Sequence, residues 1–145
     1  MRHLAIVLAI VTSPLLCNAQ VPAALGQCIV ANITASDRQD LARWVFLSMA
    51  AHPEVKQFSN ARAEAAEAAA RKVGALFTRT MRDECTKEVQ EAARAEGPPI
   101  VRSAISFFTQ LGVQELMVNH DVLTTLSSFS QFADREGIDR VIRAK

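Results

Sequence analysis

The sequence predicts an all-α protein: a single compact bundle of five or six helices joined by short turns, with one disulfide. Three observations predict this class. Apolar residues recur at the 3.6-residue spacing of a helix in several long segments. Residues that end helices, among them Pro53 and Gly97, separate these segments. No run alternates apolar and polar residues as a strand does, and no repeat or long linker divides the chain.

The N-terminal residues have the three parts of a secretory signal peptide. A basic start at Arg2 precedes the apolar run Leu4–Leu16, and small residues follow at Cys17 and Ala19. The run is shorter than the ~20 apolar residues that cross a membrane, so no transmembrane segment is expected. We predict cleavage after Ala19, with Ala23 as the alternative.

The compartment follows from this signal. Lipoprotein signals also end at a cysteine, so a lipid anchor on Cys17 is a second interpretation, although Leu16 is larger than the residue such signals place there. Arginine outnumbers lysine and tyrosine is absent, which is typical of GC-rich bacterial genomes. We therefore predict a periplasmic or secreted protein, with a signal peptide over residues 1–19 and one helical domain over residues 20–145.

Two cysteines remain after the predicted cleavage, Cys28 and Cys85. In an oxidising compartment two such cysteines usually pair. Closing a loop of roughly 60 residues contributes about 4 kcal/mol in the chain-entropy treatment. The alternative is a pair of buried free thiols. No metal site or other cofactor is predicted, because two cysteines without neighbouring histidines supply too few ligands.

The helices are expected to follow an irregular lead-in over residues 20–35, which contains Pro22 and Gly26. Ser36 and Gln39 have the spacing of a capping box and predict the first helix start. That helix is apolar on nearly all sides, which predicts the central helix of the bundle. The expected helices cover residues 37–52, 61–85, 85–97, 100–118, 122–133 and 138–145, with the second and third either continuous or kinked near Cys85.

Composition and motifs exclude several functions. Removing residues 1–19 leaves 15 basic residues against 15 acidic ones, so no general attraction to nucleic acid follows. No glycine-rich phosphate loop, HExxH pair, Gly-x-Ser-x-Gly turn or CxxC pair is present in the sequence. These observations favour a protein that is not an enzyme.

Two polar residues interrupt apolar helix faces, His52 and Glu115. A carboxylate in apolar surroundings is costly unless it is paired or protonated. Glu115 is therefore a candidate for a buried polar pair with His52 or Arg43. In the alternative, His52 caps its helix at solvent, and Glu115 reaches solvent or forms a structural salt bridge.

One helix also carries a basic face, made of Arg71, Lys72, Arg79 and Arg82. This face is a candidate for contact with an anionic partner, such as lipid headgroups or an acidic protein. The alternative is an ordinary solvated face balanced by Glu64 and Glu67.

Three features together resemble a known class of sequence: "DLARWVFLSMAAHPEV" at residues 40–55, the mid-chain Cys85, and "FFTQLGVQELM" at residues 107–117. The chain resembles small exported all-helical proteobacterial proteins with no assigned activity. The resemblance implies the fold and the compartment, and it supplies no site or activity.

Three functional hypotheses follow. The favoured one is a non-enzymatic binding or interaction protein of the bacterial cell envelope, of the inhibitor, immunity or adaptor type, with a partner protein still unknown. The alternative is a periplasmic carrier that holds a small apolar ligand between helices. The third is an enzyme that uses Glu115 and His52.

Overall fold

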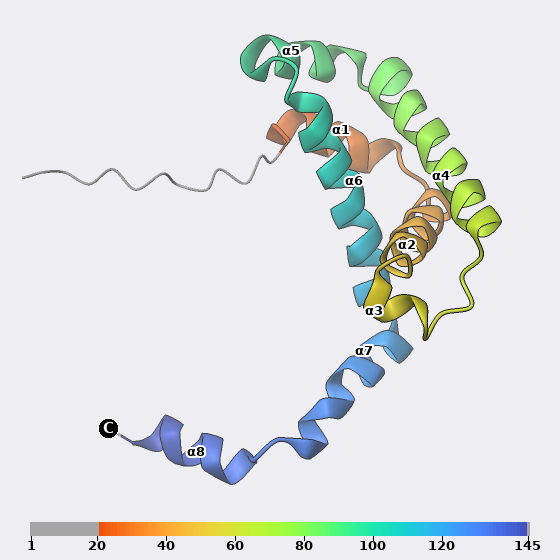
Figure 1. Ribbon diagram of the computed structural model, residues 1–145. Helices are drawn as coiled ribbons and strands as arrows, with labels where there is room; N and C mark the ends of the chain where they lie inside the picture. The colour runs from red at the N-terminus through yellow and green to blue at the C-terminus, as the bar shows by residue number, and fades with distance from the viewer. Residues whose placement is uncertain (1–20, 145) are drawn as a thin grey trace, which may run out of the picture.

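The computed structural model describes residues 21–144, and this part of the chain is helical without any strand (Figure 1), which confirms the all-α prediction. Instead of five or six helices, these residues form eight α-helices, a π-helix (η1) and a 3-10 helix (η2). Their bounds are α1 Ala23–Asn32, α2 Ala35–Met49, α3 Pro53–Lys56, α4 Ala63–Thr78, η1 Arg79–Glu84, α5 Thr86–Glu96, α6 Ile100–Met117, α7 His120–Ser127, η2 Ser128–Phe132 and α8 Arg135–Arg143.

The predicted signal peptide, including Cys17 and the cleavage position Ala19, lies outside the described residues. Among the helices from residue 21 to residue 144, none combines the length and the apolar character that crossing a membrane requires.

Helix α2 is the central helix, as predicted, and it packs against α6 and α4. Leu41 and Val45 of α2 are buried with Phe108 and Leu111 of α6. The two helices meet most closely at Gly112, where an added Cβ would lie 2.7 Å from the carbonyl oxygen of Leu41. Only a glycine permits this approach, so Gly112 sets the distance between α2 and α6.

Burial of α2 is less complete than its apolar sequence predicts. Phe46 and Met49, near its C-terminal end, are exposed. The residue that caps the start of α2 is Thr34 rather than the predicted Ser36. The Thr34 hydroxyl accepts the backbone N–H of Asp37, and the Asp37 carboxylate accepts the backbone N–H of Thr34 at 2.8 Å. This is the predicted type of cap, two residues earlier in the chain. It forms there because Asp37, three residues after Thr34, supplies the reciprocal hydrogen bond.

The predicted irregular lead-in contains a helix, α1. Leu25 and Ile29, four residues apart, are fully buried on its inner side. A helix of 10 residues is marginal by itself, so this burial supplies its stability. Gly26 lies beside α6, where an added Cβ would be 3.5 Å from the ring of Phe107. Gly26 therefore allows close packing instead of interrupting the helix.

The predicted helix over residues 61–85 is α4 followed by the π-helix η1. The N–H of Cys85 donates to the carbonyl oxygen of Thr80, five residues earlier, at 2.9 Å. After this wide turn the chain changes direction into α5 (Figure 1), which stops before Gly97 as predicted. Gly97 has a positive φ of 70°, which favours glycine at this helix end. Gly74 in α4 has no neighbouring atom within 4 Å of an added Cβ, so no close backbone approach requires a glycine there.

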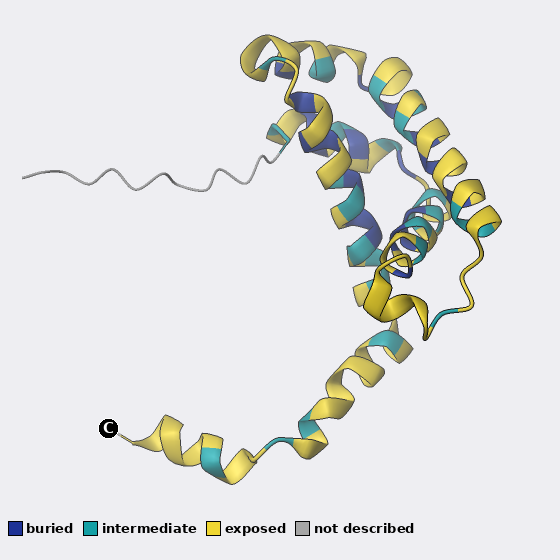
Figure 2. Ribbon diagram, in the orientation of Figure 1, coloured by how far each residue is buried: buried dark blue, intermediate teal, exposed yellow. Residues whose placement is uncertain are grey.

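The last helices leave the bundle. Residues 118–144, which we call the C-terminal arm, contain α7, η2 and α8 and run away from the body formed by α1–α6 (Figure 1). None of the arm's residues is buried (Figure 2). The compact bundle therefore comprises α1–α6, and the predicted helices over 122–133 and 138–145 do not pack into it.

Candidate functional site

A groove of about 700 Å³ lies between α1 and α6. Its size is within the range of pockets that hold small ligands or protruding side chains. None of its lining residues is charged: they are Val21, Ala23, Gly26, Gln27, Val30, Ala31, Ser103, Phe107 and Gln110. An uncharged groove of this kind suits an apolar occupant, with the two glutamine amides available for polar contacts at its edge.

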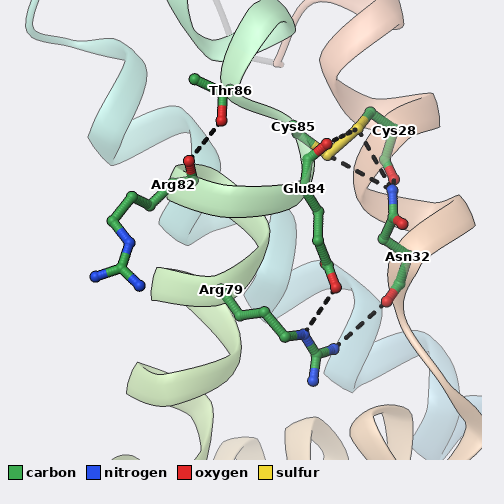
Figure 3. Close-up of a disulfide and its surroundings, with 7 residues drawn as sticks. All are labelled: Cys28, Asn32, Arg79, Arg82, Glu84, Cys85 and Thr86. Carbon is green, nitrogen blue, oxygen red and sulfur yellow. Dashed lines mark hydrogen bonds and ion pairs between the residues drawn. A yellow bond between two sulfur atoms is a disulfide. The ribbon is translucent and has the colours of Figure 1, made fainter.

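The disulfide holds the α1 wall of this groove in place (Figure 3). Cys28 of α1 and Cys85, just after η1, are bonded as predicted, with their Cα atoms 5.9 Å apart and a sequence separation of 57 residues. Cys85 is fully buried, and the Asn32 side-chain amide donates to the carbonyl oxygen of Cys28 at 2.9 Å. Helix α1 is thereby tied covalently to the corner between η1 and α5.

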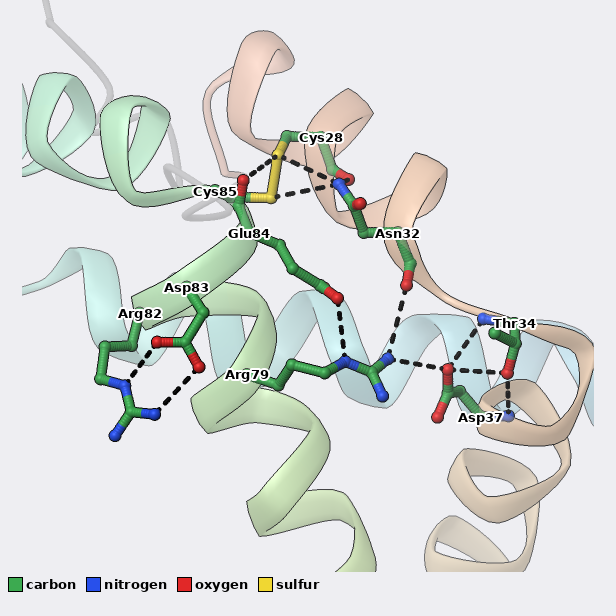
Figure 4. A network of polar contacts seen from close by, with 9 residues as sticks. All are labelled: Cys28, Asn32, Thr34, Asp37, Arg79, Arg82, Asp83, Glu84 and Cys85. Carbon is green, nitrogen blue, oxygen red and sulfur yellow. Dashed lines mark hydrogen bonds and ion pairs between the residues drawn. A yellow bond between two sulfur atoms is a disulfide. The ribbon is translucent and has the colours of Figure 1, made fainter.

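A polar network beside the disulfide joins the same elements (Figure 4). The Arg79 guanidinium lies 2.9 Å from the Asp37 carboxylate and 3.0 Å from the Glu84 carboxylate. It also donates to the carbonyl oxygen of Asn32 at 3.4 Å. One arginine therefore links η1 to the end of α1 and to the first turn of α2.

The pKa values in this network indicate stable ion pairing. Burial raises the pKa of Asp37, and the hydrogen bonds from the Thr34 backbone, the Thr34 hydroxyl and Arg79 outweigh it, so the pKa stays below its ordinary value. The hydrogen bond to Asp37 raises the pKa of Arg79. Both groups stay charged at neutral pH, which suits a structural link and not proton transfer.

The C-terminal arm presents the second unusual surface. Phe129 and Phe132 of η2 are 71% and 84% exposed, and Val141 and Ile142 of α8 are 76% and 75% exposed. Ile138, also exposed, precedes them at the spacing that places all three α8 residues on one helix face. This apolar face contacts no other part of the described chain closely enough to be buried (Figure 2).

The predicted buried polar pair does not form. Helix α2 ends at Met49, and His52 lies exposed at the start of α3, where its Nδ1 accepts the backbone N–H of Glu54 at 3.3 Å. His52 is at solvent, as in the alternative, but it caps the start of α3 instead of the end of its own helix, because Pro53 begins a new helix. Arg43 pairs instead with Asp40 at 2.6 Å.

Glu115, the other member of the predicted pair, has no buried partner among the described residues either. It is half-buried on α6, and no hydrogen bond or ion pair joins its carboxylate to another side chain between residues 21 and 144. A half-buried carboxylate can remain hydrated, so its position in an apolar stripe needs no buried partner.

The predicted basic face is largely neutralised. Each of its four residues has a carboxylate partner: Arg71 with Glu67, Lys72 with Asp40, Arg79 with Asp37 and Glu84, and Arg82 with Asp83. Such pairing leaves little uncompensated positive charge for an anionic partner. The geometry favours the balanced, solvated face.

Between residues 21 and 144, no three histidine, cysteine or acidic side chains lie close enough together to hold a metal ion. Sequence reasoning missed the groove because it treated residues 20–35 as irregular. The spacing of Leu25, Ile29 and Ile33 was the available signal for α1.

Comparisons with known proteins leave the function open. A scan against protein-family models, a search of curated proteins and a search of solved structures each found no match to this chain. The resemblance to exported proteobacterial proteins therefore stays a prediction, and the functional argument rests on the groove and the arm.

Proposed function

We propose that this chain is a non-enzymatic interaction protein of the bacterial cell envelope, of the inhibitor, immunity or adaptor type, which binds a partner protein through its C-terminal arm. The observation that carries this proposal is the arm itself. It is helical, it has no buried residue, and it presents large apolar side chains to solvent. An apolar surface that the chain does not use for its own packing is available for binding.

The exposed area supports this interpretation. Aromatic side chains bury roughly 150–250 Å² each when covered. The exposed fractions of Phe129 and Phe132 therefore leave about 300 Å² of apolar surface on two side chains alone. Typical monomers expose largest patches of only about 300–600 Å², and such patches are often functional.

The charges on α8 favour a protein partner over a membrane surface. Helices that lie on membranes carry a polar face rich in lysine and arginine. Helix α8 instead mixes Arg135, Arg140 and Arg143 with Glu136 and Asp139. Its apolar residues have the spacing by which amphipathic helices dock into grooves of other proteins.

Pull-down from envelope extract tests the proposal. The bait is the purified chain, compared with a double variant Phe129→Ser, Phe132→Ser and with the control Phe58→Ser. Phe58 is 83% exposed but lies after α3, outside the arm. We expect the wild type and the control to retain the same partner and the arm variant to lose it. Equal retention by all three baits would contradict the proposal.

The envelope location has its own test, which is the intact mass of the protein recovered from its host's periplasm. We expect a chain that begins after Ala19. A mass that includes acyl chains on Cys17 would show that lipid anchors the protein to a membrane. An uncleaved chain in the cytoplasm would contradict export.

A second candidate function is a carrier of a small apolar ligand, and the uncharged groove between α1 and α6 favours it. Native mass spectrometry of protein from its own host would then show a copurified apolar molecule. The variant Ala31→Trp, which fills the groove, should release that molecule, whereas Phe58→Ser should retain it. The third hypothesis, an enzyme using Glu115 and His52, loses its support because neither a hydrogen bond nor an ion pair joins these two described residues.

A further inference from the structure

We propose that two copies of this chain associate reciprocally, with helix α8 of each copy docked in the α1/α6 groove of the other. The inference rests on the proposed binding role of the arm, and the partner is a second copy of the chain. The groove and the exposed face of α8 are two apolar surfaces that no other element of the described chain covers. One symmetric contact covers both.

The dimensions of the two surfaces agree. Helix α8 has 9 residues and is therefore about 13 Å long at 1.5 Å per residue. The groove extends along α1 from Ala23 to Ala31, a rise of about 12 Å. It follows α6 from Ser103 to Gln110 over a similar length. A helix of two to three turns fits between these limits.

The chemistry of the two surfaces also agrees. Ala23, Gly26 and Ala31 are small, so they leave space for the side chains of an incoming helix. Ile138, Val141 and Ile142 project from one face of α8 and require an uncharged environment. The charged residues of α8 lie away from this face and stay hydrated when it is covered.

The arm's direction favours the groove of a second copy over its own. The groove lies along the first part of α6, whereas the arm leaves from the other end of that helix at Met117. From there α7 and α8 run away from the body (Figure 1). Docking in a second copy needs no reversal of the chain between α6 and α7.

A reciprocal exchange closes after two copies. A two-fold arrangement saturates both α8 faces and both grooves, so growth stops at the dimer. Each α8 inserts Ile138, Val141 and Ile142, which are 52%, 76% and 75% exposed in the single chain. Their exposed area is on the order of 200 Å² per arm, so two contacts with receiving surfaces of similar size bury about 800 Å². Standard stable interfaces bury about 1,200–2,000 Å², so we expect a weak dimer that forms at high protein concentration.

Light scattering after size-exclusion chromatography of the full chain tests this arrangement. The arm variant is Val141→Asp and the groove variant is Val30→Asp, both at positions exposed in the single chain. We expect a dimeric wild type and two monomeric variants, because a buried charge at a central contact weakens binding by about 30-fold or more. Phe58→Asp, outside both surfaces, should remain dimeric.

Mixing the two variants gives the sharpest result. The groove variant keeps an intact arm, and the arm variant keeps an intact groove, so an equimolar mixture should regain a mixed dimer through one of the two contacts. If arms paired with arms, Val30→Asp alone would remain dimeric, which would overturn the proposal. Ala31→Trp blocks the groove by size, and it should give the same monomer if the aspartate at position 30 disturbs folding.

The remaining outcomes separate this inference from the proposed function. A wild type that is monomeric at all concentrations overturns the reciprocal dimer, yet the envelope pull-down can still depend on the arm. A monomer that carries a small apolar molecule, released by Val30→Asp, would assign the groove to that ligand and also overturn the dimer. Circular dichroism of each variant confirms that the helical body is retained.

Discussion

Gly112→Ala is expected to destabilise the body by about 1–2 kcal/mol. The added Cβ would lie 2.7 Å from both the Leu41 carbonyl oxygen and the Val45 Cγ2 atom. Helix α2 must then retreat from α6 by roughly 0.7 Å, and a gap of this size forfeits a quarter to a half of each dispersion contact along the interface. Overpacking of this kind typically costs about 1–3 kcal/mol, and alanine recovers up to about 1 kcal/mol through helix propensity.

Gly74→Ala is the matched control for this substitution. It makes the same chemical change in another helix, where no atom lies within 4 Å of the added Cβ. We expect a gain of about 0.5–1 kcal/mol from the reduced freedom of the unfolded chain. The comparison therefore isolates the close approach of α2 and α6 from the intrinsic effect of replacing glycine.

Urea unfolding of the two variants, followed by circular dichroism and by the fluorescence of Trp44 on α2, measures both effects. The Gly112→Ala midpoint temperature should fall by about 4–8 °C in a parallel thermal scan. A Gly112→Ala protein as stable as the wild type would refute the α2/α6 packing described above.

Three further predictions concern the disulfide, the ion-pair network and the polar residues. Replacing Cys28 and Cys85 together by alanine should lower the unfolding free energy by about 4 kcal/mol in urea melts, and no thiol should react with an alkylating reagent in the unreduced protein that begins after Ala19. The pKa of Asp37 is lower in the folded state than in the unfolded state, so the contribution of Asp37 to the free energy of unfolding is complete above the unfolded value of 3.8 and is lost as pH falls through the folded pKa. Asp37→Asn should therefore flatten the pH dependence of stability in that acid range. An unchanged profile would show that the ionised Asp37 does not stabilise the fold. Glu115→Gln and His52→Gln should each change stability by less than about 0.5 kcal/mol and should add in the double variant, whereas a strongly non-additive loss would restore the paired arrangement.

The helices of the body could be predicted because their signals are local. The stops at Pro53 and Gly97 act within a few residues of the positions that they control, whereas the first cap was predicted two residues too late, at Ser36 instead of Thr34. The disulfide could be predicted from the number of cysteines and the expected compartment. Cys28 and Cys85 needed no further geometric information, because no other pairing remained after the predicted cleavage.

The exposure of the arm could not be predicted from its sequence pattern. An amphipathic segment such as Ile138 to Ile142 indicates that one face needs cover, but not whether the cover comes from the same chain or from another. The pairing of Glu115 failed for a related reason. The position of Glu115 on its helix depends on local spacing and could be predicted. Its distance from His52 depends on where α2 ends, and α2 ends at Met49, so His52 is not on that helix.

The central claim is that the arm serves binding and not folding. The most direct test is the free energy of unfolding of a chain that ends at Met117. The measurement compares this chain with the full chain in urea, at protein concentrations too low for self-association. Because residues 118–144 contribute no buried side chain, we predict values equal within about 0.5 kcal/mol. A loss of more than about 2 kcal/mol, or a body that no longer unfolds cooperatively, would show that the arm completes the core and would contradict the account.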